Sequence, residues 1–186
     1  MMPNMTVLAP KNDRELAEML AFAVDYDGPV AIRYPRGSAY QGLQDHQAPV
    51  EYGKSEIIHR GKKIAVLGVG SMIPSCQEVC QGLREDGYDP TFINARFVKP
   101  LDVDLLDELA EDLRLFVTVE ENVKSGGYGE HVSAYMEACH PETRVLSATV
   151  WDRFVPQGNV DSLRTRIGLG VADIRQAIED CEEVRE

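Results

Sequence analysis

The sequence has no long apolar run, because none of its hydrophobic stretches approaches the roughly 18–20 residues that a membrane-spanning helix needs. Its first residues, MMPNMTVLAPKND, lack the basic segment followed by an apolar segment that is typical of a secretory signal peptide. Basic charge is also scarce: 19 Lys and Arg stand against 31 Asp and Glu, so the formal net charge is -12. This balance argues against binding to nucleic acid or to anionic membranes. We therefore expect a cytoplasmic protein with no nucleic acid and no membrane among its partners.

Cysteine and histidine are few, and neither forms a recognised metal-binding pattern. The four cysteines contain no C-x-x-C pair, and the four histidines show no H-x-x-x-H or H-x-E spacing. Cys76 and Cys80 lie four residues apart, which would place both thiols on one face of a helix. Ile73 and Leu83 share that face, so we interpret the two cysteines as small core residues. We predict no metal site in this chain.

The first 37 residues differ in character from the rest of the chain. Asn12 and Glu15 form an N-x-x-E capping box, which predicts a helix that ends near Gly28. Residues 30–34 predict a strand. One helix and one strand cannot bury a core, so we interpret residues 1–37 as the end of a domain that begins before Met1. Residues 38–50 are polar and rich in turn formers, and they predict a linker.

Residues 51–186 alternate between apolar runs typical of buried strands and amphipathic segments typical of helices. Strands are predicted at 51–59, 63–67, 91–95, 115–119 and 144–150, and helices at 71–86, 102–113, 126–139, 161–167 and 171–183. Helices between successive strands imply crossover connections and a mostly parallel sheet covered on both faces. The predicted fold is a three-layer α/β/α domain with a mostly parallel, mixed sheet of about five strands.

Two glycine-containing turns are candidate ligand sites. Gly68-Val69-Gly70-Ser71 begins like a dinucleotide fingerprint but lacks the third glycine, which favours a plain strand-to-helix turn. The glycines of Ser125-Gly126-Gly127-Tyr128-Gly129 permit close backbone approach, either to a ligand or to a neighbouring domain. The residues alone leave both alternatives open.

Acidic residues near the ends of two predicted elements have no assigned chemistry. Glu120 and Glu121 follow a strand, and adjacent residues on an extended chain point to opposite faces, so they are not a catalytic dyad. We expect one to cap the following helix and the other to be solvated. The acidic residues between 102 and 112 are interpreted as a solvated helix face. His131 is also left without a role.

The segment Arg33-Tyr34-Pro35-Arg36-Gly37 holds two arginines at the end of a predicted strand. Guanidinium groups bind phosphate through two hydrogen bonds at once, so a rigid anion clamp is one interpretation. Two unliganded surface arginines are equally consistent with the spacing.

Several motifs in family order give the chain a resemblance to a known family. These are PNMTVLAP (3–10), GPVAIRYPRG (28–37), ARFVKPLD (95–102), TVEEN (118–122), the Gly126-Gly127-x-Gly129 turn and FVPQG (154–158). The chain resembles the C-terminal portion of the 1-deoxy-D-xylulose-5-phosphate synthases, which are transketolase-like thiamine-diphosphate enzymes. The resemblance covers nearly the whole chain. It implies that residues 1–37 are a remnant of the pyrimidine-binding domain and that residues 51–186 form a transketolase-type C-terminal domain.

The resemblance also implies an activity for the intact protein. The family condenses pyruvate with glyceraldehyde 3-phosphate, with loss of CO2, to a precursor of isoprenoids, thiamine and pyridoxal, and it uses thiamine diphosphate and Mg²⁺ as a homodimer. The second arginine of its RYPRG motif, here Arg36, holds the phosphate of the acceptor. No comparable role is implied for Arg33.

Other family motifs are missing from this chain. It has neither the G-D-G…N motif for diphosphate and Mg²⁺ nor the glutamate that activates the cofactor, so we expect no catalytic and no cofactor-binding residue here. The isolated chain is predicted to be inactive. Its C-terminal domain would be mainly architectural, packing on the missing domains of the same enzyme through an apolar surface, which favours domain contact for the Gly126–Gly129 turn.

Two alternatives remain open from the sequence. One is the C-terminal part of a 2-oxo-acid dehydrogenase decarboxylating β subunit, which shares the C-terminal fold. The other is a stand-alone, non-catalytic dimerisation or regulatory module.

Overall fold

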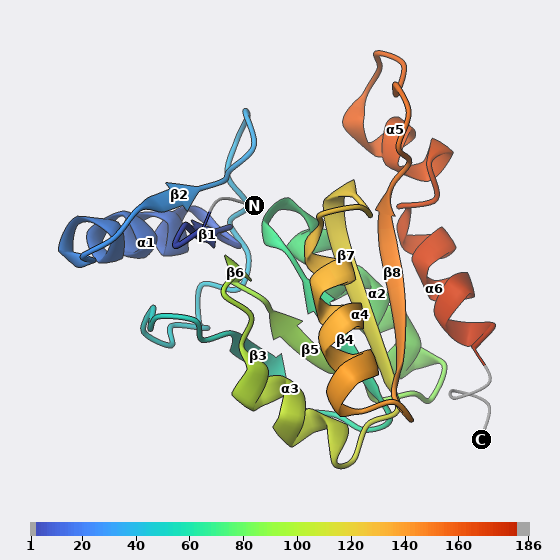
Figure 1. The fold of residues 1–186 in the computed structure, drawn as a ribbon. Coiled ribbons are helices and arrows are strands. Elements are labelled where there is room, and N and C mark those ends of the chain that lie inside the picture. Colours follow the sequence, from blue (N-terminus) through green and yellow to red (C-terminus); the bar gives the residue numbers. More distant parts are fainter. Residues whose placement is uncertain (1–2, 182–186) are drawn as a thin grey trace.

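The computed structural model describes residues 3–181, and it contains two β-sheets of unequal size (Figure 1). The smaller sheet has three strands and belongs mainly to the N-terminal segment. The larger has five strands and is built entirely from residues 56–150. No helix in the described part of the chain is both long and apolar enough to cross a membrane.

The small sheet joins the N-terminal segment to the larger domain. β1 (Thr6–Leu8) pairs in parallel with β2 (Val30–Ile32) and antiparallel with β6 (Phe97–Lys99). α1 (Asp13–Asp25) covers this sheet, and Leu8, Met19 and Phe97 form a small shared core. β1 and β6 were not predicted, and β2 is shorter than the predicted strand. Each has only three residues, too few for a periodic pattern, and their apolar residues become a core only when the two segments meet.

The predicted cap of α1 is present, although its second half differs. The Asn12 side chain accepts a hydrogen bond from the Glu15 backbone N–H at 2.9 Å. The Glu15 carboxylate accepts from the backbone N–H of Lys11, one residue before the cap, instead of closing the box on Asn12. Glu15 therefore faces the interior, where it takes part in the ion cluster described below.

The large sheet confirms the predicted fold class. Its strands are β3 (Glu56–His59), β4 (Ile64–Gly68), β5 (Thr91–Asn94), β7 (Leu115–Val123) and β8 (Arg144–Val150). Their order is β3-β5-β4-β7-β8, and only the β3–β5 pairing is antiparallel. β3 begins five residues later than predicted, and β7 runs four residues further.

Helices cover both faces of this sheet. α2 (Ile73–Glu85) and α6 (Val171–Glu179) pack on one face, and α3 (Val103–Ala110) and α4 (Tyr128–Cys139) pack on the other. Strand residues alternate accordingly: Ile64 and Val66 face α2 and α6, whereas Ala65 and Leu67 face α3 and α4.

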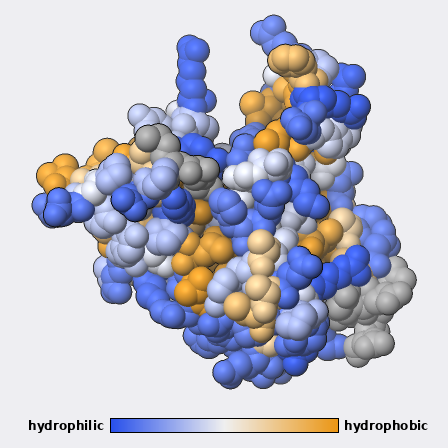
Figure 2. All heavy atoms as spheres, viewed as in Figure 1, coloured by the Kyte–Doolittle hydropathy of each residue, from blue (hydrophilic) through white to orange (hydrophobic). Residues whose placement is uncertain are grey.

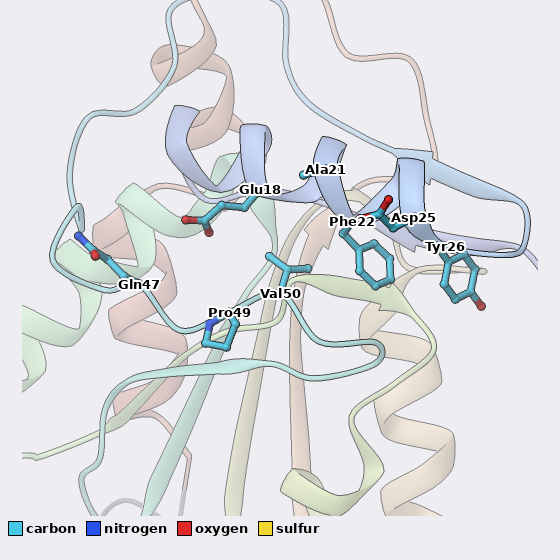
Figure 3. Close-up of a pocket in the computed structure, with 8 residues that line it drawn as sticks. All are labelled: Glu18, Ala21, Phe22, Asp25, Tyr26, Gln47, Pro49 and Val50. Carbon is cyan, nitrogen blue, oxygen red and sulfur yellow. The ribbon is translucent and has the colours of Figure 1, made fainter.

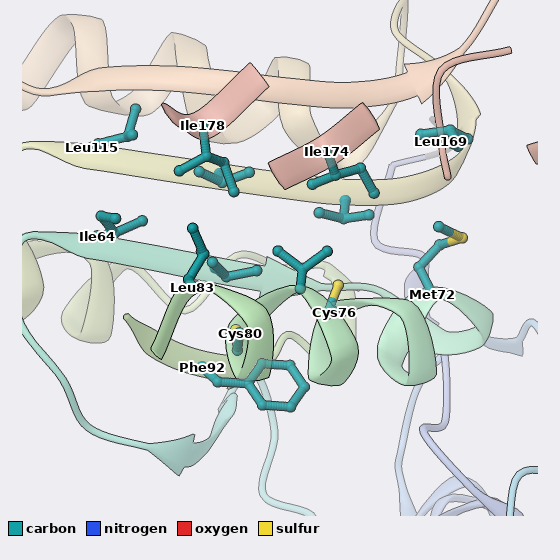
Figure 4. Close-up of a cluster of buried hydrophobic side chains, with 14 of the residues drawn as sticks. Ile64, Met72, Cys76, Cys80, Leu83, Phe92, Leu115, Leu169, Ile174 and Ile178 are labelled. Carbon is teal, nitrogen blue, oxygen red and sulfur yellow. The ribbon is translucent and has the colours of Figure 1, made fainter. Parts of the chain in front are cut away.

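The two cysteines of α2 are core residues, as predicted. Cys76 and Cys80 are fully buried and lie between α2 and the sheet (Figure 4). Burial raises the pKa of the Cys80 thiol to about 12, and it raises that of Cys76 as well. Both thiols are therefore protonated and unreactive near neutral pH.

The ends of the large domain carry shorter elements. A 3-10 turn (Gly70–Met72) precedes α2, which supports the plain-turn interpretation of the Gly68–Ser71 segment. α5 (Val160–Arg166) lies beyond the carboxyl ends of β7 and β8 (Figure 1). The helix predicted at 171–183 is present over Val171–Glu179, and its last two residues lie outside the described range. Residues 38–50 contain no helix or strand.

Candidate functional site

Four charged side chains form a buried cluster where α1 meets the large domain. Lys11 Nζ lies 3.0 Å from Glu15 and 2.7 Å from Glu56, and Arg96 Nε lies 2.7 Å from Glu15. Arg96 Nη2 is 3.3 Å from Glu56, and the Asn94 amide also donates to Glu15. Each charged side chain is at most 3% exposed. Two cations and two carboxylates balance, so the cluster buries no net charge.

The cluster fixes the N-terminal segment to the large domain. Glu15 lies in the first turn of α1 and Lys11 just before that helix, whereas Glu56 lies on β3 and Arg96 follows β5. Arg96 also donates to the backbone carbonyls of Ala48 at 2.7 Å and Pro49 at 2.9 Å, so it holds the segment between the two parts as well. Sequence analysis found Arg96 only as part of a family motif, because nothing local shows that its charge is buried.

The pKa of Glu56 predicts an acid-sensitive contribution to stability. Burial alone raises this pKa, but the hydrogen bond from Lys11 and the charges of Arg96 and Lys11 outweigh burial and lower it below its ordinary value of 4.5. A lowered pKa stabilises the folded state above pH 4.5, and this stabilisation is lost as the pH falls through the folded-state pKa.

We therefore expect Glu56→Gln to lower the free energy of unfolding at pH 7. Below pH 4.5, the free energies of unfolding of the variant and of the unmodified chain should become more alike. Urea unfolding of both proteins at several pH values between 3 and 7 measures this. Parallel pH profiles for the two proteins would contradict the assignment.

The RYPRG loop borders a cavity of about 670 Å³ between the N-terminal segment and the large domain. Its walls come from the start of α1, the loop at 34–40, the turn before α2, the end of β7 and α5. The charged residues that line it are Lys11, Arg36, Glu121 and Arg164. A smaller cavity of about 180 Å³ shares Tyr34, Pro35, Ser71 and Glu121 with it.

The two arginines of the loop occupy different positions. Arg36 lines the larger cavity, and within residues 3–181 its side chain makes no ion pair. Arg33 lines the smaller cavity, and its backbone N–H donates to the carbonyl of Leu8 at 2.8 Å. Both side chains are exposed. The geometry therefore leaves Arg36 free to bind an anion in the larger cavity.

Glu120 and Glu121 have different roles, as predicted for adjacent strand residues. Glu120 is fully buried and accepts hydrogen bonds from the backbone N–H groups of Tyr128 at 3.0 Å and Gly129 at 2.8 Å, so it caps α4. Glu121 reaches the cavity, where it accepts from Ser71 at 2.9 Å and from Arg164. Glu121 is exposed but paired, which corrects the expectation that it is only solvated.

The glycines of the 126–129 turn approach side chains of this same domain. A Cβ at Gly127 would lie 2.6 Å from Glu120 Oε1, and one at Gly129 would lie 2.5 Å from Thr118 Oγ1. A side chain at Gly127 would collide with the capping carboxylate of Glu120, and one at Gly129 would collide with β7. Contacts within this domain therefore explain both glycines, and no neighbouring domain is needed to do so. Gly126, whose φ is +74°, has open space around it.

Two acidic residues at α3 bind partners from other elements, so the interpretation of these residues as a solvated face is incomplete. Asp102 is buried and accepts from the Ser55 backbone N–H at 2.7 Å, and Asp107 binds Tyr135 and His140, each at 2.7 Å. These partners come from distant elements and are not visible in the local sequence. His131 lies half-buried on α4 and lines none of the cavities described here.

A third cavity is an open groove of about 630 Å³ between α1 and residues 47–50 (Figure 3). Phe22 and Tyr26 point into it from α1, and Pro49 and Val50 lie opposite. Its charged lining residues are the carboxylates Glu18 and Asp25, with no Lys or Arg among the lining residues described. A phosphorylated ligand therefore fits the RYPRG cavity and not this groove.

Comparison with protein families decides the class of the large domain. The model of the transketolase C-terminal domain matches residues 53–174. The chain belongs to the transketolase C-terminal domain family. This confirms the fold class and the transketolase-like resemblance predicted from the motifs.

The curated relatives narrow the resemblance. The 1-deoxy-D-xylulose-5-phosphate synthase of Lachnoclostridium phytofermentans is 42% identical over 174 residues, which cover 93% of this chain and 28% of that protein. The synthase of Dictyoglomus thermophilum is 40% identical over 179 residues, which cover 96% and 29%. The predicted resemblance to this synthase family is confirmed. The chain spans less than a third of the length of these relatives.

Solved structures agree with the assignment. A structure described as a split-gene transketolase, inactive β4 tetramer, superposes with a TM-score of 0.87 at 26% identity, covering 96% of this chain and 57% of that one. Transketolase from Campylobacter jejuni superposes with a TM-score of 0.75 at 17% identity, which shows the shared fold alone.

Residues 3–181 contain no group of three or more His, Cys, Asp or Glu side chains placed to hold a metal ion. Mg²⁺ bound to a diphosphate is held by carboxylate and carbonyl oxygens.

Proposed function

We propose that this chain is the C-terminal portion of a 1-deoxy-D-xylulose-5-phosphate synthase. The observation that carries the proposal is the identity of about 40% to such synthases over more than nine-tenths of the chain. The intact enzyme would condense pyruvate with glyceraldehyde 3-phosphate, with loss of CO2, using thiamine diphosphate and Mg²⁺. Its product would supply isoprenoid, thiamine and pyridoxal synthesis. It would act in the cytoplasm as a homodimer.

The proposed domain division follows the resemblance. Residues 1–37 would complete the pyrimidine-binding domain, residues 38–50 would be the linker, and residues 51–186 would be the C-terminal domain. The family match from residue 53 supports the second boundary. β6 lies within residues 51–186 but pairs with β1 in the small sheet. The proposed C-terminal domain therefore contributes one strand to the sheet of the N-terminal segment.

Within the intact enzyme, Arg36 would bind the phosphate of glyceraldehyde 3-phosphate. Its position in the larger cavity and its lack of an ion-pair partner within the described chain support this role. A phosphate monoester is close to a dianion at neutral pH, so it suits an exposed guanidinium better than a neutral sugar would.

The isolated chain would be catalytically inactive. The inactive state named for the similar split-gene structure supports this. The rest of the same enzyme would pack on exposed apolar side chains. These lie at the end of α1 (Leu20, Val24) and near α5 (Phe154, Val160), where Figure 2 shows hydrophobic surface.

A chimera tests the proposal. Residues 3–186 replace the corresponding C-terminal segment of the Lachnoclostridium phytofermentans synthase, and formation of 1-deoxy-D-xylulose 5-phosphate is measured. We expect the chimera to form product and the isolated chain to form none. The parent synthase is the matched control. A folded, cofactor-bound chimera without activity, or product formation by the isolated chain, would contradict the proposal.

A further inference from the structure

Arg96 lies where the chain passes from the large sheet to the small one. β5 ends at Asn94 in the large sheet, and β6 begins at Phe97 in the small sheet. The φ of Arg96 is +54°, in the left-handed region that residues with a side chain rarely adopt. The Phe97 backbone N–H donates to the carbonyl of Ala95 at 2.5 Å, which closes a γ-turn around Arg96. A strained turn of this kind persists only where the surrounding structure holds it.

The contacts of the Arg96 side chain hold this turn. The residue is 1% exposed, and its Nε donates to Glu15 at 2.7 Å. Nη1 donates to the carbonyl of Pro49 at 2.9 Å, and Nη2 donates to that of Ala48 at 2.7 Å. Nη2 also lies 3.3 Å from Glu56. All three guanidinium nitrogens therefore have a partner, and these partners belong to α1, to the linker and to β3.

The linker is anchored along its length although it contains no helix or strand. The hydroxyl of Tyr40 donates to Gln77 of α2 at 2.6 Å. The amide of Asn12, which caps α1, donates to the carbonyl of Gly42 at 3.0 Å. Arg96 then holds the far end of the linker. A segment fixed at its start, its middle and its end can pass a displacement at one end to the other.

We propose that Arg96 is a positioning residue for the RYPRG loop: it fixes the linker and the end of β1, and these fix the loop that carries Arg36. Arg96 itself lines none of the three cavities described above, so it acts through other residues. The inference rests on the proposed function in one respect, because the position of the loop affects the reaction only if Arg36 binds the acceptor.

Arg96 contacts the chain on both sides of the RYPRG loop. Before the loop, the backbone N–H of Ala9 donates to the carbonyl of Arg96 at 2.8 Å, and that of Arg33 donates to the neighbouring carbonyl of Leu8 at 2.8 Å. After the loop, the linker runs to the two carbonyls that accept from the Arg96 guanidinium. Arg36 lies between these two attachments.

A lysine at position 96 separates positioning from charge. Arg96→Lys keeps the positive charge that balances the buried cluster and leaves the backbone N–H and C=O in place. A single ammonium group cannot reproduce the fixed fork through which the guanidinium binds two carbonyls and a carboxylate. We therefore expect the variant to fold and to release the linker from the large domain.

Amide hydrogen exchange of the 186-residue chain tests the release. Peptides that cover the linker should exchange about tenfold faster in Arg96→Lys, whereas peptides from β4 and β7 should keep their rates. Arg114→Lys is the matched control, because Arg114 Nη1 also donates to two carbonyls, those of Ala110 and Leu113, outside the linker. Linker exchange that is unchanged in Arg96→Lys, or equally faster in Arg114→Lys, would overturn the inference.

A second measurement needs no variant and decides the question if Arg96→Lys does not fold. In ¹⁵N NMR spectra of the unmodified chain, the Nη–H signals of Arg96 should be resolved from one another and slow to exchange, because both nitrogens are buried and bound. Those of the exposed Arg36 should be averaged by rotation. Averaged Nη–H signals of Arg96 would overturn the inference.

A double-mutant cycle in the chimera tests the effect on the RYPRG loop. Arg96→Lys should raise the KM for glyceraldehyde 3-phosphate about threefold to tenfold, and the KM for pyruvate much less, because the phosphate-binding loop is misplaced. In the Arg36→Ala background, Arg96→Lys should raise the acceptor KM no further, because no guanidinium remains to be positioned. Equal effects of Arg96→Lys in the two backgrounds would overturn the inference and make Arg96 a structural residue only.

These results separate the inference from the proposed function. If the chimera with the unmodified sequence is folded and inactive, the proposed function fails, and hydrogen exchange alone supports or overturns the fixing of the linker by Arg96. If the chimera is active and Arg96→Lys leaves the acceptor KM unchanged, the proposed function stands and the inference fails.

Discussion

An Arg36→Ala variant of the intact enzyme is expected to raise the KM for glyceraldehyde 3-phosphate about 10- to 150-fold, the equivalent of one lost charge-assisted contact of about 1.5–3 kcal/mol. The KM for pyruvate should change little, because pyruvate has no phosphate for Arg36 to bind. Steady-state kinetics with each substrate varied at a saturating concentration of the other gives both constants.

Arg33→Ala is the matched control for this prediction. Arg33 lies three residues away on the same loop and is also exposed, but it lines the smaller cavity. We expect a much smaller effect of Arg33→Ala on the acceptor KM. An unchanged acceptor KM in Arg36→Ala, or an equal rise in the two KM values, would remove Arg36 from the phosphate site.

Glu15→Gln is expected to lower the free energy of unfolding of the chain by about 3–5 kcal/mol, as is usual when one partner of a buried ion pair is removed. The carboxylate of Glu15 accepts from Lys11, Asn94 and Arg96. The substitution leaves two buried cations facing the single remaining carboxylate of Glu56. Urea unfolding at pH 7 measures the loss.

Glu18→Gln provides a close comparison on the same helix. Glu18 also binds an arginine Nε, that of Arg14 at 2.9 Å, but its side chain is 33% exposed, against 1% for Glu15. A surface pair of this kind contributes less than about 1 kcal/mol. Equal losses in the two variants would show that the cluster at Glu15 stabilises the fold no more than a surface contact does.

The regular part of the fold could be predicted from sequence because its signals are local. Five strands of the large sheet follow from short apolar runs, and the helices between them follow from apolar spacing and from caps such as Asp102, whose carboxylate accepts from the Leu105 backbone N–H. The parallel pairing then follows from the crossover connections. The observed ends of these elements differ from the predicted ends by a few residues.

The small sheet and the buried cluster could not be predicted from local patterns. β1 and β6 are three residues long and pair across about ninety residues of sequence. Glu15 looks like an ordinary capping residue, and Arg96 looks like a surface cation, until the fold brings them to 2.7 Å. Their burial depends on tertiary contacts that no sequence window contains.

The candidate site also combines a feature that local sequence reveals with one that only the tertiary structure reveals. The RYPRG loop was visible as two arginines held by a proline, and the resemblance selected Arg36. Arg164 was missed because α5 is short and its arginines look like ordinary solvent-exposed charges. It enters the site only because α5 lies beyond the carboxyl ends of β7 and β8, beside Glu121.

The nucleotide sequence immediately upstream of the Met1 codon tests most directly whether this chain is part of a longer synthase. We predict an open reading frame that continues for several hundred codons and encodes the G-D-G…N motif that this chain lacks. A stop codon and a ribosome-binding site just before Met1 would contradict this, and would make the chain a separate module whose binding partner has to be sought.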